Sequence, residues 1–396
     1  MPLPLEGIRV LDVTQVMAGP FCTMLLADMG ANVIKIEKPG GGDSIRKIGP
    51  PFINGESAAF LAINRNKRSI VLDLKTEKGV EILSGMAEKA DIIVQNMSPG
   101  SMDRLGLGYD QIHSINPSMI YCSISGHGAT GPDNYKPGFD LVAQGLSGLM
   151  HLTGYDDDMP TKVGVPITDL NAGMYATYGI LSAYINRLKT GKGQHVDTSL
   201  LESGIAYTIW ESAIFFATGT DPGASGTSHP LIAPYQAFST NDGHINVGAA
   251  NQSKWKQLCV AIERLDLLDD HRFASNALRM ENKKHLEEIL GEVFQSQGTE
   301  HWVKVLEKAG VPCGAILKLS QSYSSAQMKE REMSINIQHP TAGMVRNIGI
   351  PVKLSQTPGS IRRAAPTYGQ HTDEILQEFG HQKKDLFALR EKEIIT

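Results

Sequence analysis

Asp169 is the residue whose surroundings point most directly to chemistry. It lies in the segment KVGVPITDLNAGMYATYGIL, where a run punctuated by Gly and Pro gives way to a helical pattern. One interpretation is an N-cap, whose side chain accepts hydrogen bonds from the first backbone amides of the helix. The other is a nucleophile: the helix dipole and the free amides keep the carboxylate ionised, and an ionised carboxylate with one open face can attack a thioester carbonyl.

Glu37 suggests a different kind of site, because it ends the second apolar run of a strand–helix–strand unit, where an acid can bind a ribose. The first turn of that unit, however, reads TQVMAGPFC and lacks G-x-G-x-x-G, and Pro20 stands where close helix packing needs a glycine. A nicotinamide or flavin site is therefore disfavoured. The chain also lacks a Walker A sequence, an H-E-x-x-H pair and a G-x-S-x-G elbow.

Alternating strands and helices in the first third must position these residues. Strands are predicted at the short apolar runs 8–13, 32–37, 69–74, 91–96 and 119–125, with helices at 21–30 and 76–90. Parallel neighbours need such crossover connections, so the pattern predicts a Rossmann-like α/β fold with a parallel sheet covered on both faces. A longer helix is predicted at 169–189, followed by a strand and a helix in QHVDTSLLESGIA.

The second half of the chain indicates a smaller α+β domain. The segment GTDPGASGTS (219–228) has the composition of a linker, and a hairpin with an Asn241-Asp242-Gly243 turn and a helical block at 253–308 follow it. We therefore predict a large domain at 1–218, completed by 367–396, and a small domain at 229–330. The segments 219–228 and 331–366 are predicted linkers, and a single capped helix is predicted near the end.

Composition narrows the class of protein. The 396 residues are 41% hydrophobic and 20% charged, as in soluble globular domains, and the net charge of −5 gives no electrostatic footprint for nucleic acid or an anionic membrane. The four cysteines show no paired spacing of a zinc site or a disulfide scaffold, so we expect reduced thiols and no metal. The N-terminus lacks the features of a signal peptide, and a cytoplasmic location is expected.

Several motifs, in order, carry a resemblance that covers nearly the whole chain. They are LEGIRVLDVTQVMAGPFCTMLLADMGANVIKIEKPGGGDSIR, NRNKRSIVLDLK, NMSPGSMDRLGLGYDQI, SGHGATGPDNYKPGFD, VGVPITDLNAG and TGKGQHVDTSLLES. With these motifs the chain resembles the class III coenzyme A transferases, the CaiB/BaiF or formyl-CoA transferase-like family. The resemblance implies an interlocked homodimer in which the chains thread through each other, with acyl-CoA and a carboxylic acid as small-molecule substrates.

The resemblance also implies roles for residues. Asp169 matches the aspartate that attacks the acyl-CoA and carries CoA as a thioester. The positions implied for CoA are Val16, Ala18, Lys38, Leu72, Lys75, Asn96, Met97 and Arg104. The positions implied for the acyl group or the acceptor acid are Gln15, Met17, Arg46, Phe139 and Gly248, the last in a VGAAN turn similar to the family's glycine-rich loop. Lys38, Lys75 and Arg104 would supply the local positive charge that an acidic protein needs for a polyanionic ligand.

Two alternatives remain open at this point. The 2-methylacyl-CoA racemases share the fold but carry GHD where this chain reads GFD, so Phe139, which cannot move a proton, would replace their base. A catalytically silent CoA-binding protein is the second alternative, and the intact PITD segment argues against it. Formyl-CoA:oxalate transferases carry a glutamine and a tyrosine where this chain has Met17 and Ala59, so succinyl-CoA with a dicarboxylate or another organic acid is our first hypothesis.

Overall fold

A computed structural model describes residues 2–155 and 159–396. The chain forms two compact units. The larger takes in Met1–Leu149, Lys162–Ala217 and Ala326–Thr396, and the smaller takes in Met150–Thr161 and Thr218–Ser325. This division differs from the predicted one at four places. The segments 150–161 and 218–228 belong to the smaller unit, and the segments 326–330 and 331–366 belong to the larger unit.

The larger unit is built on the predicted parallel sheet. Its six strands are β1 (Arg9–Val13), β2 (Asn32–Glu37), β5 (Lys67–Val71), β6 (Ile92–Gln95), β7 (Ile120–Ser125) and β8 (His195–Ser199). They lie in the order β5-β2-β1-β6-β7-β8, with every pair parallel. The order reverses direction between β1 and β6. Ligands of open parallel sheets bind at such a switch point, outside the carboxyl ends of the strands.

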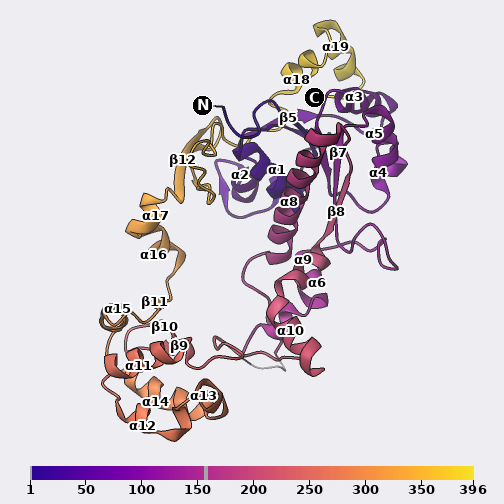
Figure 1. The fold of residues 1–396 in the computed structure, drawn as a ribbon. Coiled ribbons are helices and arrows are strands. Elements are labelled where there is room, and N and C mark those ends of the chain that lie inside the picture. Colours follow the sequence, from indigo (N-terminus) through magenta and orange to yellow (C-terminus); the bar gives the residue numbers. More distant parts are fainter. Residues whose placement is uncertain (1, 156–158) are drawn as a thin grey trace. The chain divides into compact units, whose positions relative to one another are not determined.

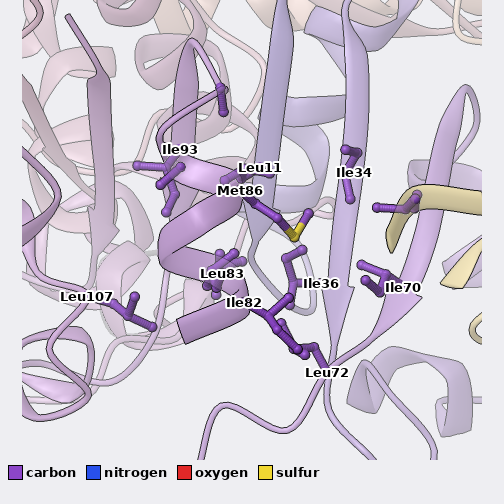
Figure 2. Packing of buried hydrophobic residues seen from close by; sticks show 14 of the residues in the cluster. Leu11, Ile34, Ile36, Ile70, Leu72, Ile82, Leu83, Met86, Ile93 and Leu107 are labelled. Atoms are coloured by element: carbon purple, nitrogen blue, oxygen red, sulfur yellow. The ribbon is translucent and has the colours of Figure 1, made fainter. Parts of the chain in front are cut away.

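Alternating side chains along the strands bury both faces of the sheet. Val10, Val33 and Ile92 pack with α1 (Ala18–Asp28) and α8 (Ile167–Thr190) on one face. Leu11 and Ile93 point to the other face, together with Leu83 and Met86 of α3 (Glu77–Ala87), as Figure 2 shows. The helices α5 (Tyr109–Ile115), α18 (Thr372–Glu378) and α19 (Lys383–Glu391) contribute to this second layer. The predicted parallel sheet, covered by helices on both faces, is therefore confirmed.

The segment 331–366 departs from the prediction because it contains an antiparallel hairpin, β12 (Ser334–His339) and β13 (Gly343–Ile348). Ala342 and Val345 are buried in one cluster with Phe60 and Leu61 of α2 (Ala58–Ile63). One face of the hairpin thus has a partner far away in the sequence. The chain then ends in two helices, α18 and α19, where a single one is predicted.

The smaller unit has a three-stranded antiparallel sheet in the order β11-β10-β9, from β9 (Tyr235–Ser239), β10 (His244–Gly248) and β11 (Cys313–Ala315). The predicted hairpin is confirmed. The core of the smaller unit includes Trp255, Phe273, Phe294 and Trp302. The helices of this unit are α11 (Gln252–Ala261), α12 (Asp266–Asp269), η2 (His271–Phe273), α13 (Asn276–Glu281), α14 (Lys283–Gln295), α15 (Thr299–Lys308) and α16 (Leu319–Ser324).

The remaining elements are short, and Figure 1 shows where several of the helices among them fall along the chain. They are η1 (Ser44–Lys47), β3 (Phe52–Ile53), β4 (Glu56–Ser57), α4 (Ser101–Arg104), α6 (Asp140–Leu146), α7 (Leu149–Leu152), α9 (Leu200–Tyr207), α10 (Ile209–Thr218) and α17 (Ala326–Glu330). None of the helices in the described residues combines the length and the apolar character that a bilayer crossing requires.

Candidate active site

Two neighbouring pockets of the larger unit lie where the loops after β1 and β6 meet, at the switch point of the sheet. One, of about 340 Å³, is lined by Asp169; the other, of about 300 Å³, is lined by Lys38, Lys75 and Arg104. Gln15 and Met97 line both of them. The strand order therefore brings the predicted nucleophile and the three predicted cations to the two sides of one pair of loops.

Asp169 lies in the first turn of α8, but it is not the N-cap. Pro166 takes that position and makes no side-chain cap, so Asp169 is the third helical residue. The backbone amide of Ala18, the first residue of α1, lies close enough to lower the pKa of its carboxylate. The two helices touch through Gly173, where a Cβ would lie 2.7 Å from the Ala18 carbonyl oxygen. This close contact holds the start of α1 against the carboxylate.

The acidity of Asp169 differs from the expectation of a simply ionised group. Burial, together with the nearby Asp140 carboxylate, raises its pKa to about 7, and the Ala18 amide offsets this only in part. Desolvation penalises the charged form of a carboxylate more than the helix terminus favours it here. A carboxylate of this acidity is about half ionised near neutral pH, and it is more basic than a solvated aspartate.

Asp140 is a feature that the sequence interpretation did not place in the site. It begins α6, and its Oδ1 accepts hydrogen bonds from the Thr168 amide (3.0 Å) and hydroxyl (2.8 Å). Its Oδ2 accepts from Gln144 Nε2 at 2.7 Å. The residue therefore fixes the turn that carries Asp169 and also acts on its charge. Its position after GF in the resembling motif KPGFD is the signal that could have identified it.

A pair of glycines shapes the Asp169 pocket and was also missed. Gly126, after β7, and Gly138, before α6, both line it, and their backbones are in contact. A Cβ on Gly126 would lie 2.5 Å from the Gly138 Cα, and one on Gly138 would lie 2.2 Å from the Gly126 Cα, far inside contact distance. Only glycine at both positions allows the two loops to close this wall. The SGHG and KPGFD motifs contain the two residues.

The second pocket has the charge expected for a polyanion site. Lys38, Lys75 and Arg104 are exposed and line it, and Leu72 forms part of its buried floor. Glu37 and Asp43 line it too, but they are paired with Arg46 and Lys35. The lysines and the arginine can therefore act on a ligand in this pocket without facing unpaired buried acids.

Asn96 uses its side chain on the backbone. Its Oδ1 accepts from the Gln15 amide at 2.9 Å, and its Nδ2 donates to the Gln15 carbonyl at 2.8 Å. These two polar atoms bridge the loops after β6 and β1, and the contact of Asn96 with CoA stays a prediction. Gln15, Val16, Met17, Ala18, Asn96, Met97 and Phe139 all line the Asp169 pocket.

Two predicted substrate residues lie elsewhere. Arg46 lines neither pocket; its guanidinium pairs with Glu37 at 2.7 Å, lies 3.6 Å from the Phe60 ring centroid, and has a side chain only 9% exposed. The same ion pair occupies Glu37, which lowers the pKa of that carboxyl against the effect of burial and leaves it unavailable to a ribose. Gly248 ends β10 in the smaller unit, where its amide donates to the Pro312 carbonyl at 2.9 Å.

The Asp169 pocket presents a carboxylate beside an aromatic side chain. Phe139 lines it with a side chain 71% exposed, and none of the described residues that line it is a histidine. Likewise, no group of three His, Cys, Asp or Glu within 2–155 and 159–396 is arranged to hold a metal ion.

Comparisons with known proteins agree with this geometry. Residues 5–372 match the profile of CoA-transferase family III. The succinyl-CoA:glutarate CoA-transferase of Mus musculus is 42% identical, over 95% of this chain and 86% of that protein. The succinyl-CoA:mesaconate CoA-transferase of Haloarcula hispanica is 38% identical, over 95% and 96%.

Solved structures extend the likeness to three dimensions. The crystal structure of a CAIB/BAIF family protein from Brucella suis covers 96% of this chain and 100% of its own, with a TM-score of 0.86 and 36% identity. A parallel sheet with its switch point at two adjoining pockets, a profile match over most of the chain and relatives above 30% identity all point the same way. The chain belongs to CoA-transferase family III and is an enzyme of that class.

Proposed function

We propose that the enzyme moves CoA from an acyl-CoA to a free carboxylic acid through a covalent thioester on Asp169. The observation that carries this proposal is the pair of adjoining pockets. One presents a partly buried carboxylate, the other presents Lys38, Lys75 and Arg104, and Gln15 and Met97 line both. A CoA thioester has this composition, with a reactive acyl end and a polyanionic nucleotide end.

The proposed steps balance without a metal or an external proton. The Asp169 carboxylate attacks the acyl carbonyl, the C–S bond breaks, and CoA leaves as a thiolate. The acyl group remains on Asp169 as a mixed anhydride. The thiolate then attacks the aspartyl carbonyl and releases the donor acid as a carboxylate. The acceptor carboxylate repeats these steps in reverse, which regenerates Asp169 and yields the new acyl-CoA. The thioester energy is conserved throughout because each intermediate is an activated acyl group.

The raised pKa of Asp169 suits this role. A carboxylate with a pKa of about 7 is a stronger nucleophile than one with a pKa near 4, and it is still ionised in a sufficient fraction at neutral pH. The Ala18 amide can hold one oxygen while the other faces the pocket. The racemase alternative lacks such support, since the pocket residue at its catalytic position is Phe139.

We further propose that the substrates are succinyl-CoA and a dicarboxylate. Relatives named for succinyl-CoA with glutarate and with mesaconate support this, since they match over nearly the whole chain. The pocket wall agrees with a chain longer than oxalate, because Met17 and Phe139 supply apolar surface and Lys136 supplies a cation. A panel of dicarboxylates assayed against succinyl-CoA and acetyl-CoA measures the preference.

Trapping the intermediate tests the mechanism. After incubation with succinyl-CoA alone, we expect a mass increase that matches bound CoA, which hydroxylamine converts to a hydroxamate on Asp169. The Asp169→Ala variant is the control and should show no adduct. Absence of any adduct in the parent protein would favour a silent CoA-binding protein. Labelling on Asp140 or Glu202 would assign the nucleophile to another residue.

The protein is further proposed to be an interlocked homodimer. Support comes from apolar side chains that one chain leaves exposed on α8 and α10: Tyr178 and Leu188 are 70% and 69% exposed, and Ile209 and Phe216 are 77% and 80% exposed. A soluble monomer rarely exposes so much apolar surface on neighbouring helices. Sedimentation equilibrium from nanomolar to micromolar concentration tests this. A folded monomer of 43.0 kDa would contradict interlocking.

Three expectations stay predictions. They are a substrate-binding role for Gly248, a cytoplasmic location, and the lack of nucleic-acid or membrane partners. Fractionation of cells and substrate-dependent protection of the 247–251 backbone in hydrogen exchange are the measurements that bear on them.

A further inference from the structure

The turn between β1 and α1 carries residues for both pockets, and most of its backbone polar groups are held from outside. Buried or partly buried side chains make these contacts. They are Asp12 to the Thr14 amide (3.0 Å), Lys35 to the Thr14 carbonyl (2.9 Å), Asn96 to both groups of Gln15 (2.9 and 2.8 Å), Asp43 to the Val16 amide (3.0 Å) and Lys67 to the Pro20 carbonyl (2.9 Å).

Val16 is the strained point of this turn. Its φ of +67° lies in the left-handed region, which a β-branched residue adopts at a cost. The next residue, Met17, is the N-cap of α1 and makes no side-chain cap. The turn therefore needs an external contact to keep Val16 in this conformation, and the Val16 amide has one partner, the Asp43 carboxylate.

Asp43 is itself firmly placed. Its Oδ2 lies 2.8 Å from Lys35 Nζ, with the two side chains 1% and 0% exposed. Its Oδ1 also accepts from the Ile45 amide at 3.1 Å, and its own amide donates to Glu37 at 3.0 Å. One buried ion pair thus makes two hydrogen bonds to the turn: Asp43 accepts from the Val16 amide, and Lys35 donates to the Thr14 carbonyl.

We propose that Asp43 is a positioning residue for the transfer reaction. Through the Val16 amide, it holds the first βα turn in the strained conformation that presents the Ala18 amide to Asp169. The inference rests on the proposed nucleophile. Without Asp43, Val16 relaxes toward ordinary β-region angles, α1 starts differently, and the Asp169 carboxylate loses the amide that orients it.

A merely structural role would give a similar loss of stability, so the test compares buried charges at the two ends of α1. Asp28 ends the helix, is 1% exposed and pairs with Arg65 at 2.7 Å, but it lines neither pocket. Asp28→Ala therefore also breaks a buried ion pair, at the far end of the same helix. Asp43→Asn serves if Asp43→Ala does not fold, because it keeps the size of the side chain.

The decisive variant is Val16→Gly, since glycine adopts a positive φ without strain. At saturating succinyl-CoA, Asp43→Ala should slow formation of the Asp169 adduct at least about tenfold, while Asp28→Ala stays within about threefold of the parent rate. Val16→Gly should change the rate of adduct formation by one factor in the Asp43→Ala background and by another in the parent enzyme. We expect the first factor to be at least about three times the second.

Two outcomes would overturn the proposal. One is an Asp43→Ala protein that folds and forms the adduct within about twofold of the parent rate. The other is an equal effect of Val16→Gly in both backgrounds. If the parent enzyme itself forms no adduct on Asp169, the proposed function fails instead. The parent, Asp43→Ala, Val16→Gly and the double variant then still measure the coupling between positions 43 and 16 in a steady-state transfer assay.

Discussion

Asp12 and Asp169 are carboxylates of the same unit, and their pKa values shift in opposite directions. Burial raises the pKa of Asp12, but Lys67 and Lys35 outweigh burial and lower it to about 2. Burial raises the pKa of Asp169 to about 7, because the nearest charge is Asp140 and the only opposing contact is the Ala18 amide. Desolvation acts on both, and the presence or absence of a cation decides the result.

The comparison distinguishes a carboxylate that stabilises the fold, Asp12, from one that can react with a substrate, Asp169. Asp12 sits 2.9 Å from Lys67 with both side chains fully buried, and it also accepts from Thr14 and Thr23. The carboxylate oxygens of Asp12 therefore accept hydrogen bonds from the protein itself and are not open to a substrate. Asp169 lines a pocket, and none of the lysines and arginines in the described part of the chain forms a salt bridge with it, so its reactivity remains available to a substrate. Four predictions test this difference, from the largest expected effect to the smallest.

Asp169→Ala should lower transfer by on the order of 10⁴-fold or more, because removal of a covalent nucleophile abolishes the main reaction path. CoA affinity should change little, since Lys38, Lys75 and Arg104 line the other pocket. The measurements are initial rates and CoA titration by calorimetry. Turnover within about tenfold of the parent would mean that the Asp169 carboxylate is not the nucleophile.

Asp12→Asn should destabilise the fold by about 3–5 kcal/mol, since it leaves the buried Lys67 ammonium without its counter-charge. Denaturant unfolding measures the free energy. Asp266→Asn is the control: it breaks the exposed pair with Arg264 and should cost far less than the buried pair. Equal losses for the two variants would show that burial of the pair is unimportant.

The pH profile should show the raised pKa of Asp169. Its ionised form is the nucleophile, so kcat/KM for acyl-CoA should fall about tenfold per pH unit below about 7 and level off above it. Asp140→Asn removes the neighbouring negative charge and should move this fall in kcat/KM to lower pH. If kcat/KM of the Asp140→Asn variant falls at the same or a higher pH, the Asp140 charge does not raise the pKa of Asp169.

Lys75→Met should raise KM for acyl-CoA by up to about tenfold and reduce its dependence on salt, with kcat unchanged, because an exposed cation contributes binding and no chemistry. Lys78→Met is the matched control. That lysine lies on the same stretch of chain, pairs with Glu81 and lines neither pocket. A similar KM increase in both variants would indicate a general charge effect instead of a phosphate contact.

Particular residues show where sequence interpretation stops. The order of β1, α1 and β2 follows from local periodicity, and so does the long helix that carries Asp169. Arg46 illustrates the limit, because its role depends on Glu37 and on the Phe60 ring, a contact that its own neighbours do not reveal. The β12–β13 hairpin is similar: its buried face packs against α2, nearly 280 residues earlier.

The sequence by itself determined the class of the protein. Its short apolar runs with crossover helices predict a parallel α/β sheet, and its motifs carry the resemblance to the CoA-transferases that implies Asp169 as the candidate nucleophile. Only the tertiary structure decided the state of that aspartate. Its acidity depends on Asp140 and Ala18, and its orientation on a turn held by Asp43 and Lys35. Burial and charge are sums over neighbours in space, and chain order does not list those neighbours.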